Sequence, residues 1–409
     1  MARKVYFLSG PPGRLFLLTR VFSTGIALLM ALYYTKLLGL EKRSILSFIM
    51  VSALILTVVF TSGISLTFRN RPKDRVEGDN LFGFLGVILA SGLLVGAIST
   101  VLLKCYSLLQ GILPTSVYIA CFFYSALGCV NLGVIDGLIA HGNLRLASYF
   151  DFSSIVFQLL FLFSLIQLDQ TTIFMSIILS FIVSYLLITF AAFSVFFQSY
   201  AINIKKVLPS GKNLIVESKH NQIFGIANGF LDRVDRFIIG LALPIESLAK
   251  YSLITGIISY SRFLPEAMNK LKIQKLRQGS QNVNLSYFEW SSSRITYLSV
   301  VIVSMVLTLL ATSFVSLFFG KEWSLPTEIP LLFTLQELMR AAYQAKATTE
   351  ITKGNSSYVN RLSLLLLICS SLLMCLGVSV LGIVGAPLSM IITYSVLMYI
   401  ISRNVRTIF

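Results

Sequence analysis

The feature that most constrains this chain is a series of apolar segments, each about 20 residues long, which is the length that one helix needs to cross a bilayer. Twelve segments of this kind lie at approximately residues 15–38, 44–68, 81–103, 112–135, 149–168, 173–196, 222–243, 247–265, 295–319, 327–349, 361–380 and 382–402. Charged residues make up only 12% of the chain, against about 25% in a typical soluble protein. We therefore predict an all-α polytopic membrane protein with twelve transmembrane helices.

The distribution of basic residues predicts the orientation of the chain. Lys and Arg number 33 against 17 Asp and Glu, so that the net charge is +16. In alternating loops between the predicted helices, 21 basic residues fall on one side and four on the other. Cytoplasmic loops carry such an excess, which places both termini in the cytoplasm. Nucleic-acid binding would need a soluble basic domain, and we expect none.

Residues that commonly carry enzyme chemistry are few and poorly spaced. The five cysteines form no Cys-x-x-Cys pair, and the two histidines, His141 and His220, are far apart in predicted loops. The sequence contains no nucleotide-binding glycine motif, nucleophile elbow or zinc-protease motif. We expect no catalytic residue, no metal site and no cofactor, and therefore a transporter rather than an enzyme.

The longest inner loops are predicted at residues 197–221 and 266–294, and the first of them divides the helices into two groups of six. We expect an N-terminal six-helix lobe at 1–200, a cytoplasmic linker at 201–221 and a C-terminal lobe at 222–409. An even number of helices gives both lobes the same orientation. This favours two parallel repeats around a central cavity.

The predicted seventh helix carries the highest density of membrane-embedded charge. At about 100° per residue, Asn228, Asp232, Asp235 and Arg236 share one face of a continuous helix, and Arg233 flanks it. Asp232 and Arg236 are spaced to pair at i,i+4. Two interpretations stay open: an ion-pair cluster that holds helices together, or the polar lining of the cavity.

The predicted tenth helix has a polar stripe. Gln336, Arg340 and Gln344 recur every fourth residue beside Glu337, and lipid cannot solvate such a stripe. In the first half of the chain, Arg20 lies inside the first helix, where it can reach either the surface or a cavity. Basic residues outnumber acidic residues within the membrane segments. A cavity with this balance favours an anion, and the planar fork of arginine suits phosphate.

Short motifs in a fixed order carry a resemblance to a known family. They are Leu37–Glu41 (Leu-Leu-Gly-Leu-Glu), Ser62–Ile64 before Arg69, Asp235–Gly240 (Asp-Arg-Phe-Ile-Ile-Gly) followed by Ala249–Tyr251, Leu317–Trp323 and Gly382–Pro387. In these motifs and in its twelve-helix layout, the chain resembles the bacterial polysaccharide flippases, or Wzx-type O-antigen transporters. Arg43 and Ser44 depart from the family, which often has Tyr-Gly at this point.

The resemblance implies the fold of the multidrug/oligosaccharidyl-lipid/polysaccharide transporter superfamily. It also implies a function: undecaprenyl-diphosphate-linked oligosaccharide crosses the bacterial cytoplasmic membrane by alternating access through a cationic cavity. By resemblance, Asp235 and Arg236 belong to this cavity, whereas Arg233, Arg340 and Arg20 are assigned to it by depth and charge. The expected partners are the lipid-linked substrate, membrane lipids and the polysaccharide assembly machinery of lipopolysaccharide or O-antigen synthesis.

Two other functions remain open. A multidrug cation antiporter of the same superfamily would use carboxylates such as Asp232 and Asp235, although neighbouring arginines neutralise them. A polysaccharide polymerase would need a sizeable outer loop, and the outer loops here are short. The sequence leaves the coupling ion, H⁺ or Na⁺, open.

Overall fold

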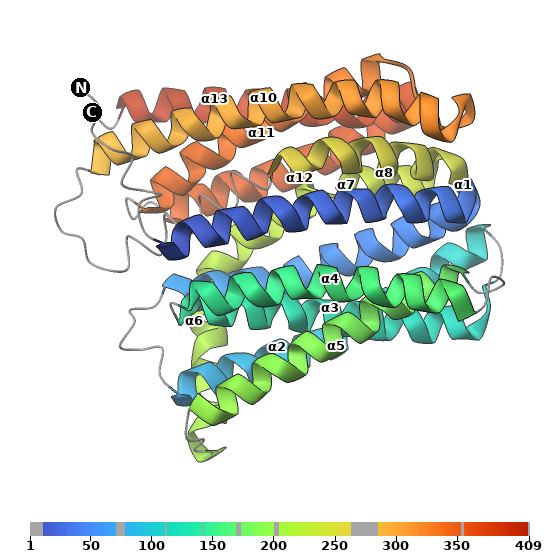
Figure 1. Cartoon of the computed structure of the whole chain (residues 1–409). Helices are drawn as coiled ribbons and strands as arrows, with labels where there is room; N and C mark the ends of the chain where they lie inside the picture. Colours follow the sequence, from blue (N-terminus) through green and yellow to red (C-terminus); the bar gives the residue numbers. More distant parts are fainter. Residues whose placement is uncertain are drawn as a thin grey trace. The chain divides into compact units, whose positions relative to one another are not determined.

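The computed structural model describes residues 11–70, 78–110, 113–141, 143–168, 173–199, 204–262, 285–352 and 356–407. These residues are almost entirely helical and include no strand (Figure 1). The helices are α1 (Pro11–Asn70), α2 (Gly78–Gln110), α3 (Thr115–Ala140), α4 (Leu144–Leu168), α5 (Ile173–Ser199), α6 (Ile204–Leu231), α7 (Val234–Ala242), α8 (Ile245–Ser259), α10 (Leu285–Phe319), α11 (Glu328–Thr352), α12 (Ser356–Leu381) and α13 (Gly385–Thr407). Short 3₁₀ turns lie at η4 (Tyr260–Arg262), η5 (Lys321–Trp323) and η6 (Gly382–Val384). The predicted all-α class is confirmed.

Several helices have the length and composition of membrane spans. Seven such segments are found among the described residues. Two of them, Leu18–Phe68 with 51 residues and Ser357–Ile401 with 45 residues, are about twice as long as one crossing requires. The chain is therefore a multi-pass membrane protein, while the number of twelve spans stays a prediction.

Glycines break both of these long segments near the predicted boundaries. Gly39 has a φ of 68° and interrupts α1, and Gly382 has a φ of 60° and separates α12 from α13. A side chain is strained in this left-handed region, whereas glycine adopts it readily. The two glycines therefore let the chain end one helix and begin the next, as the predicted spans 15–38 and 44–68, or 361–380 and 382–402, require.

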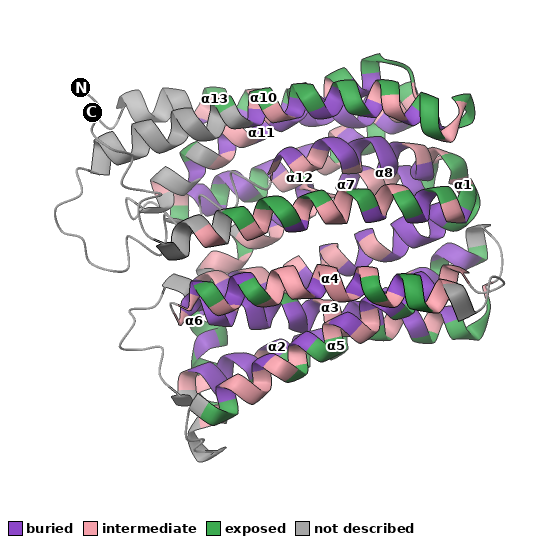
Figure 2. Cartoon of the chain, in the orientation of Figure 1, coloured by how far each residue is buried: buried purple, intermediate pink, exposed green. Residues whose placement is uncertain are grey.

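The exposed faces of the helices are apolar, as expected where lipid surrounds them. On α10, Leu298, Ile302, Met305 and Leu309 follow one another at helical spacing, and each is more than half exposed. Figure 2 shows exposed residues running along α10 beside a buried stripe. Polar side chains such as Ser304 lie instead among the buried residues. This inversion, with apolar groups outside and polar groups inside, is typical of a helix bundle in a membrane.

Contacts between Cα atoms divide the chain into two compact units. Among the described residues, the first unit holds 11–37 and 52–222, and the second holds 38–51, 223–262 and 285–407. The boundary near residue 222 lies within α6, which begins at Ile204. Most of the inner loop predicted at 197–221 is helical, because α6 begins at Ile204. The assignment of 1–200, 201–221 and 222–409 to lobes and a linker stays a prediction.

Within the first unit, α2 and α3 pack closely through small residues. A Cβ atom at Gly92 would lie 2.9 Å from the carbonyl oxygen of Ala126, and one at Gly96 would lie 2.8 Å from that of Phe122. Gly137 on α3 in turn faces Phe84 of α2. The Gly-x-x-x-Gly spacings at 92–96 and 133–137 thus serve close helix packing.

Candidate functional site

The site lies in the second unit, at a break in the helix that the sequence predicts to be continuous over 222–243. α6 ends at Leu231, α7 begins at Val234, and Asp232 and Arg233 form the turn between them. The backbone of Arg233 leaves the helical region, with φ −142° and ψ −5°. A continuous helical face shared by Asn228, Asp232, Asp235 and Arg236 is therefore wrong. The physical reason is that charged groups in apolar surroundings need partners. The break lets Asp232 pair with Arg340 while Asp235 accepts a hydrogen bond from Tyr251.

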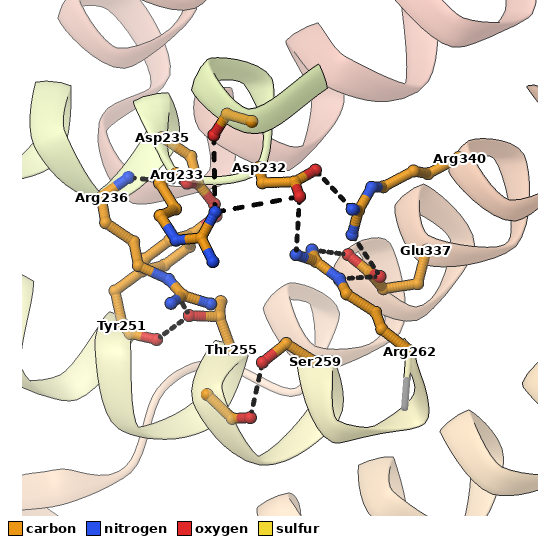
Figure 3. Close-up of polar contacts among 12 residues, drawn as sticks. Asp232, Arg233, Asp235, Arg236, Tyr251, Thr255, Ser259, Arg262, Glu337 and Arg340 are labelled. Atoms are coloured by element: carbon orange, nitrogen blue, oxygen red, sulfur yellow. Dashed lines mark hydrogen bonds and ion pairs between the residues drawn. The ribbon is translucent and has the colours of Figure 1, made fainter. Parts of the chain in front are cut away.

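Asp232 lies among three arginines from different elements (Figure 3). Its Oδ1 is 2.5 Å from Nη2 of Arg340 on α11, and its Oδ2 is 3.9 Å from Nη1 of both Arg233 and Arg262. The expected i,i+4 pair of Asp232 with Arg236 does not form among these contacts. Asp232 instead joins α11 and the η4 turn to the α6–α7 break.

Glu337 completes this ion-pair network. The Nε and Nη2 groups of Arg262 donate to its two carboxylate oxygens, and Nη1 of Arg340 donates to Oε2 at 3.4 Å. The fork of Arg262 thus binds Glu337 with two parallel bonds. The side chain of Glu337 is 2% exposed and that of Arg340 is 5% exposed. Arg262 and Arg340 are therefore already engaged by carboxylates.

Asp235 and Arg236 form a second, adjacent group on α7 and α8. The hydroxyl of Tyr251 donates to Oδ2 of the buried Asp235 at 2.9 Å, and the backbone N–H of Arg236 donates to Oδ1. The Nε of Arg236 donates to Oγ1 of Thr255 at 3.1 Å, which orients the guanidinium. Its Nη2 is buried and has no hydrogen-bond partner within the described part of the chain.

The two groups together carry an excess of positive charge. Four arginines, at 233, 236, 262 and 340, face three carboxylates, at 232, 235 and 337. If all are ionised, the net charge is one positive. Such an excess favours an anion over a cation near the site, and the buried Nη2 of Arg236 is the donor that has no hydrogen-bond partner among the described contacts of this guanidinium.

Of the other polar residues predicted for the site, two are described on α11. Gln336 is buried beside the network on α11, and its Oε1 also lacks a hydrogen-bond partner in the described structure. Gln344 is half-buried one turn beyond Arg340. The stripe on α11 thus faces protein rather than lipid. The side chain of Asn228 lies outside the described residues.

Arg20 lies in the first unit, whereas the residues of the network belong to the second unit. Its Nη1 donates to Oδ2 of Asp151 on α4, and the two side chains are 25% and 20% exposed. Ser154 and Gln158 continue the polar face of α4 from Asp151, and Nε2 of Gln158 donates to Oγ of Ser154 at 3.4 Å. The structure therefore places Arg20 in an ion pair between α1 and α4.

Sequence reasoning left four partners out of the predicted site. These are Asp151, Tyr251, Thr255 and Arg262. A signal existed for Asp151, because it begins an i, i+3, i+7 polar series on an otherwise apolar helix. Arg262 was visible as a basic residue inside a predicted membrane segment, and Tyr251 as part of the Ala249–Tyr251 motif. Their pairing with Glu337 and Asp235 could not be predicted, because it depends on the α6–α7 break.

Nothing in the described residues suggests a metal centre. No group of three or more His, Cys, Asp or Glu side chains there could hold a metal ion. All five cysteines are free.

Comparison with solved structures gives the fold. The chain is similar to the eukaryotic MATE transporter AtDTX14, with a TM-score of 0.67 and 11% identity, over 98% of this chain and 95% of that one. It is similar to the lipid II flippase MurJ in an inward closed conformation, with a TM-score of 0.69 and 14% identity, over 96% and 87% of the two chains. This chain has the fold of these transporters. A Vibrio cholerae MATE transporter, VcmN, in a bent form is also similar, with a TM-score of 0.63 and 14% identity, over 97% of both chains.

The transporter fold does not by itself separate flippases from multidrug transporters, because both occur among these structures. No model of a protein family matches the sequence. No curated protein matches it either. The choice of substrate therefore depends on the chemistry of the site.

Proposed function

We propose that this chain is a flippase that moves undecaprenyl-diphosphate-linked oligosaccharide across the bacterial cytoplasmic membrane by alternating access. The observation that carries the proposal is the arginine-rich network of the second unit, with its net positive charge and the unpartnered Nη2 of Arg236. A diphosphate offers several anionic oxygens, and guanidinium groups bind such oxygens in pairs.

The contacts suggest a division of roles among the arginines. Among the described residues, Nε of Arg236 donates to Thr255 and its Nη2 has no partner. The contacts described for Arg233 are a 3.9 Å ion pair with Asp232 and a long 3.5 Å bond to the carbonyl of Gly229. These two would contact the diphosphate. Arg262 and Arg340 are engaged by Glu337 and Asp232. They would position the network and raise its positive potential.

The remaining predicted residues would serve other parts of the substrate. Gln336 and Gln344 would offer hydrogen bonds to sugar hydroxyls, and Arg20 with Asp151 would form a polar site in the first unit. By alternating access, the head group would be exposed first to the cytoplasm and then to the outside while the polyprenyl chain stays in lipid. The similarity to the MurJ fold supports this proposal, because that protein is a lipid II flippase.

A multidrug cation antiporter is the second candidate, favoured by a comparable structural similarity to MATE transporters. Such a protein needs carboxylates that can bind a cation or a proton. The site carboxylates are engaged instead: Asp232 and Glu337 by arginines, and Asp235 by Tyr251 and a backbone N–H. This argues for an anionic substrate. The coupling ion, the place of the protein in O-antigen or lipopolysaccharide assembly, and the cytoplasmic location of both termini belong to the same proposal.

A leaflet-resolved assay tests the proposal. Cells depleted of the protein are labelled with a membrane-impermeant glycan probe, and lipid-linked oligosaccharide is measured on each face of the membrane. We expect the repeat unit to accumulate inside while outer labelling falls. Unchanged outer labelling, together with increased drug sensitivity, would instead support the antiporter.

A further inference from the structure

The first half of α6 crosses one end of the first unit. Oγ of Ser210 donates to Oδ1 of Asn80 at 2.6 Å, and Nδ2 of Asn221 donates to Oγ1 of Thr67 at 2.9 Å. Asn80 lies in the first turn of α2, and Thr67 lies in the last turn of α1. Eleven residues of helix, about 16 Å, therefore connect the beginning of one spanning helix to the end of another. Figure 1 shows α6 running transverse to α2.

This position places α6 at the level of the membrane surface. α1 and α2 are candidate membrane spans, so the ends that α6 touches lie near the lipid head groups. Residues 71–77, which join these ends in the sequence, include Arg71, Lys73 and Arg75. A helix at this depth meets acyl chains on one side and head groups on the other.

The side chains of α6 are arranged for that environment. Gly211, Leu214 and Ser218 are buried, and Gly211 packs against Gly83 of α2. Beside this packed face runs a stripe of exposed residues at i, i+4, i+7 and i+11, which we call the Leu–Lys stripe. Its members are Leu208, Lys212, Ile215 and Lys219.

The Leu–Lys stripe alternates apolar and basic side chains. Leu208 is 80% exposed and Ile215 is 47% exposed, which is costly in water but favourable in the acyl boundary. Lys212, which lies between these two residues in the sequence, and Lys219, which follows them, are also exposed. Long lysine side chains reach outward to phosphate groups while their stems lie on apolar surface.

We propose that the Leu–Lys stripe binds the anionic phospholipids of the membrane surface. Leu208 and Ile215 enter the acyl boundary, and Lys212 and Lys219 contact lipid phosphates. This site shares no residue with the arginine network, because it consists of first-unit residues, whereas the network belongs to the second unit. The proposal stands whether the transported substrate is a lipid-linked glycan or a drug.

The test measures phospholipid binding to the full-length purified protein by native mass spectrometry, with phosphatidylglycerol or phosphatidylcholine added. The test variant is Lys212→Gln/Lys219→Gln. The matched control is Lys104→Gln/Lys321→Gln, which removes the same charge from two exposed lysines elsewhere. At about 1 kcal/mol per lysine near an anionic surface, the test variant is expected to lose roughly 30-fold in phosphatidylglycerol affinity, while the control and phosphatidylcholine binding change little.

A second variant separates the apolar contribution. Leu208→Ser/Ile215→Ser is expected to weaken the binding of both phosphatidylglycerol and phosphatidylcholine, since these side chains would contact the acyl chains that both lipids have. Equal losses in the test and control lysine variants, or wild-type protein that binds the two lipids equally, would overturn the proposal. Unchanged lipid binding in both stripe variants would also overturn it. The melting temperature of each variant without added lipid verifies folding.

Discussion

Arg340 on α11 pairs with Asp232 at the α6–α7 break, with 2.5 Å between Nη2 and Oδ1. The two side chains are only 5% and 14% exposed. Their contact connects segments that lie more than 100 residues apart in the sequence. Since both charges are largely removed from water, each depends on the other for compensation. The pair therefore holds α11 to the α6–α7 break at the centre of the ion-pair network.

A double-mutant cycle tests this dependence. Asp232→Ala is expected to lower the free energy of unfolding by about 3–5 kcal/mol, because it leaves Arg340 buried and partly uncompensated. The double variant Asp232→Ala/Arg340→Ala should be less destabilised than the sum of the single variants. Unfolding of the purified protein in detergent gives these values. Additive effects of the two substitutions would show that the pair is not coupled.

The kink in α1 gives a prediction about backbone conformation. Gly39 has a φ of 68°, and no atom lies within 4 Å of the position that a Cβ would take. Gly39→Ala is thus expected to destabilise the protein by about 1–2 kcal/mol through backbone strain alone. Gly25→Ala in the same helix is the matched control, since it also meets open space but has no positive φ. The control is expected to be neutral or slightly stabilising, and equal melting temperatures for both variants would contradict the kink.

The α2–α3 interface gives a prediction about packing. Gly92→Val would force a side chain against the carbonyl oxygen of Ala126, at a cost of about 1–3 kcal/mol. Gly86→Val in the same helix is the control for the change in helix propensity, because a Cβ at Gly86 meets no atom within 4 Å. Thermal unfolding of the two variants is compared. A loss of stability at Gly86 that matches the loss at Gly92 would disprove the close approach.

Much of the fold could be predicted from hydropathy alone, because lipid demands long apolar helices. The breaks at Gly39 and Gly382 also follow from the sequence, since each glycine lies between two apolar runs. The helix at 204–221 was not predicted, because the lysines and other polar residues of this segment are typical of a cytoplasmic loop. Its structure becomes clear only from contacts such as Ser210 with Asn80.

The candidate site was predicted in composition but not in geometry. Asp232, Arg233, Asp235, Arg236, Glu337 and Arg340 do come together, as their membrane depth and charge suggested. Helical periodicity, however, paired Asp232 with Arg236, whereas the structure pairs Asp232 with Arg340. Periodicity assumes an unbroken helix, and the break at Asp232 and Arg233 is stabilised by tertiary ion pairs that no local pattern encodes.

The arginine roles give the most specific functional prediction. Arg236→Ala removes the donor proposed to bind diphosphate, whereas Lys250→Ala removes a basic residue of α8 that has no assigned role. Loss of one charge-assisted contact should lower the transport rate by about tenfold or more, since such bonds contribute about 1.5–3 kcal/mol. Arg236→Lys is expected to restore transport only in part, because lysine lacks the planar fork.

The most direct measurement is flipping of an undecaprenyl-diphosphate-linked oligosaccharide by the purified protein in liposomes. Flipping is detected when the glycan becomes accessible to a glycan-modifying probe outside the liposomes. We expect transport by the wild-type protein and by Lys250→Ala, and a severe loss in Arg236→Ala at equal reconstitution. Absence of flipping by the wild type, with transport of an organic cation in the same vesicles, would contradict the flippase proposal and support the antiporter.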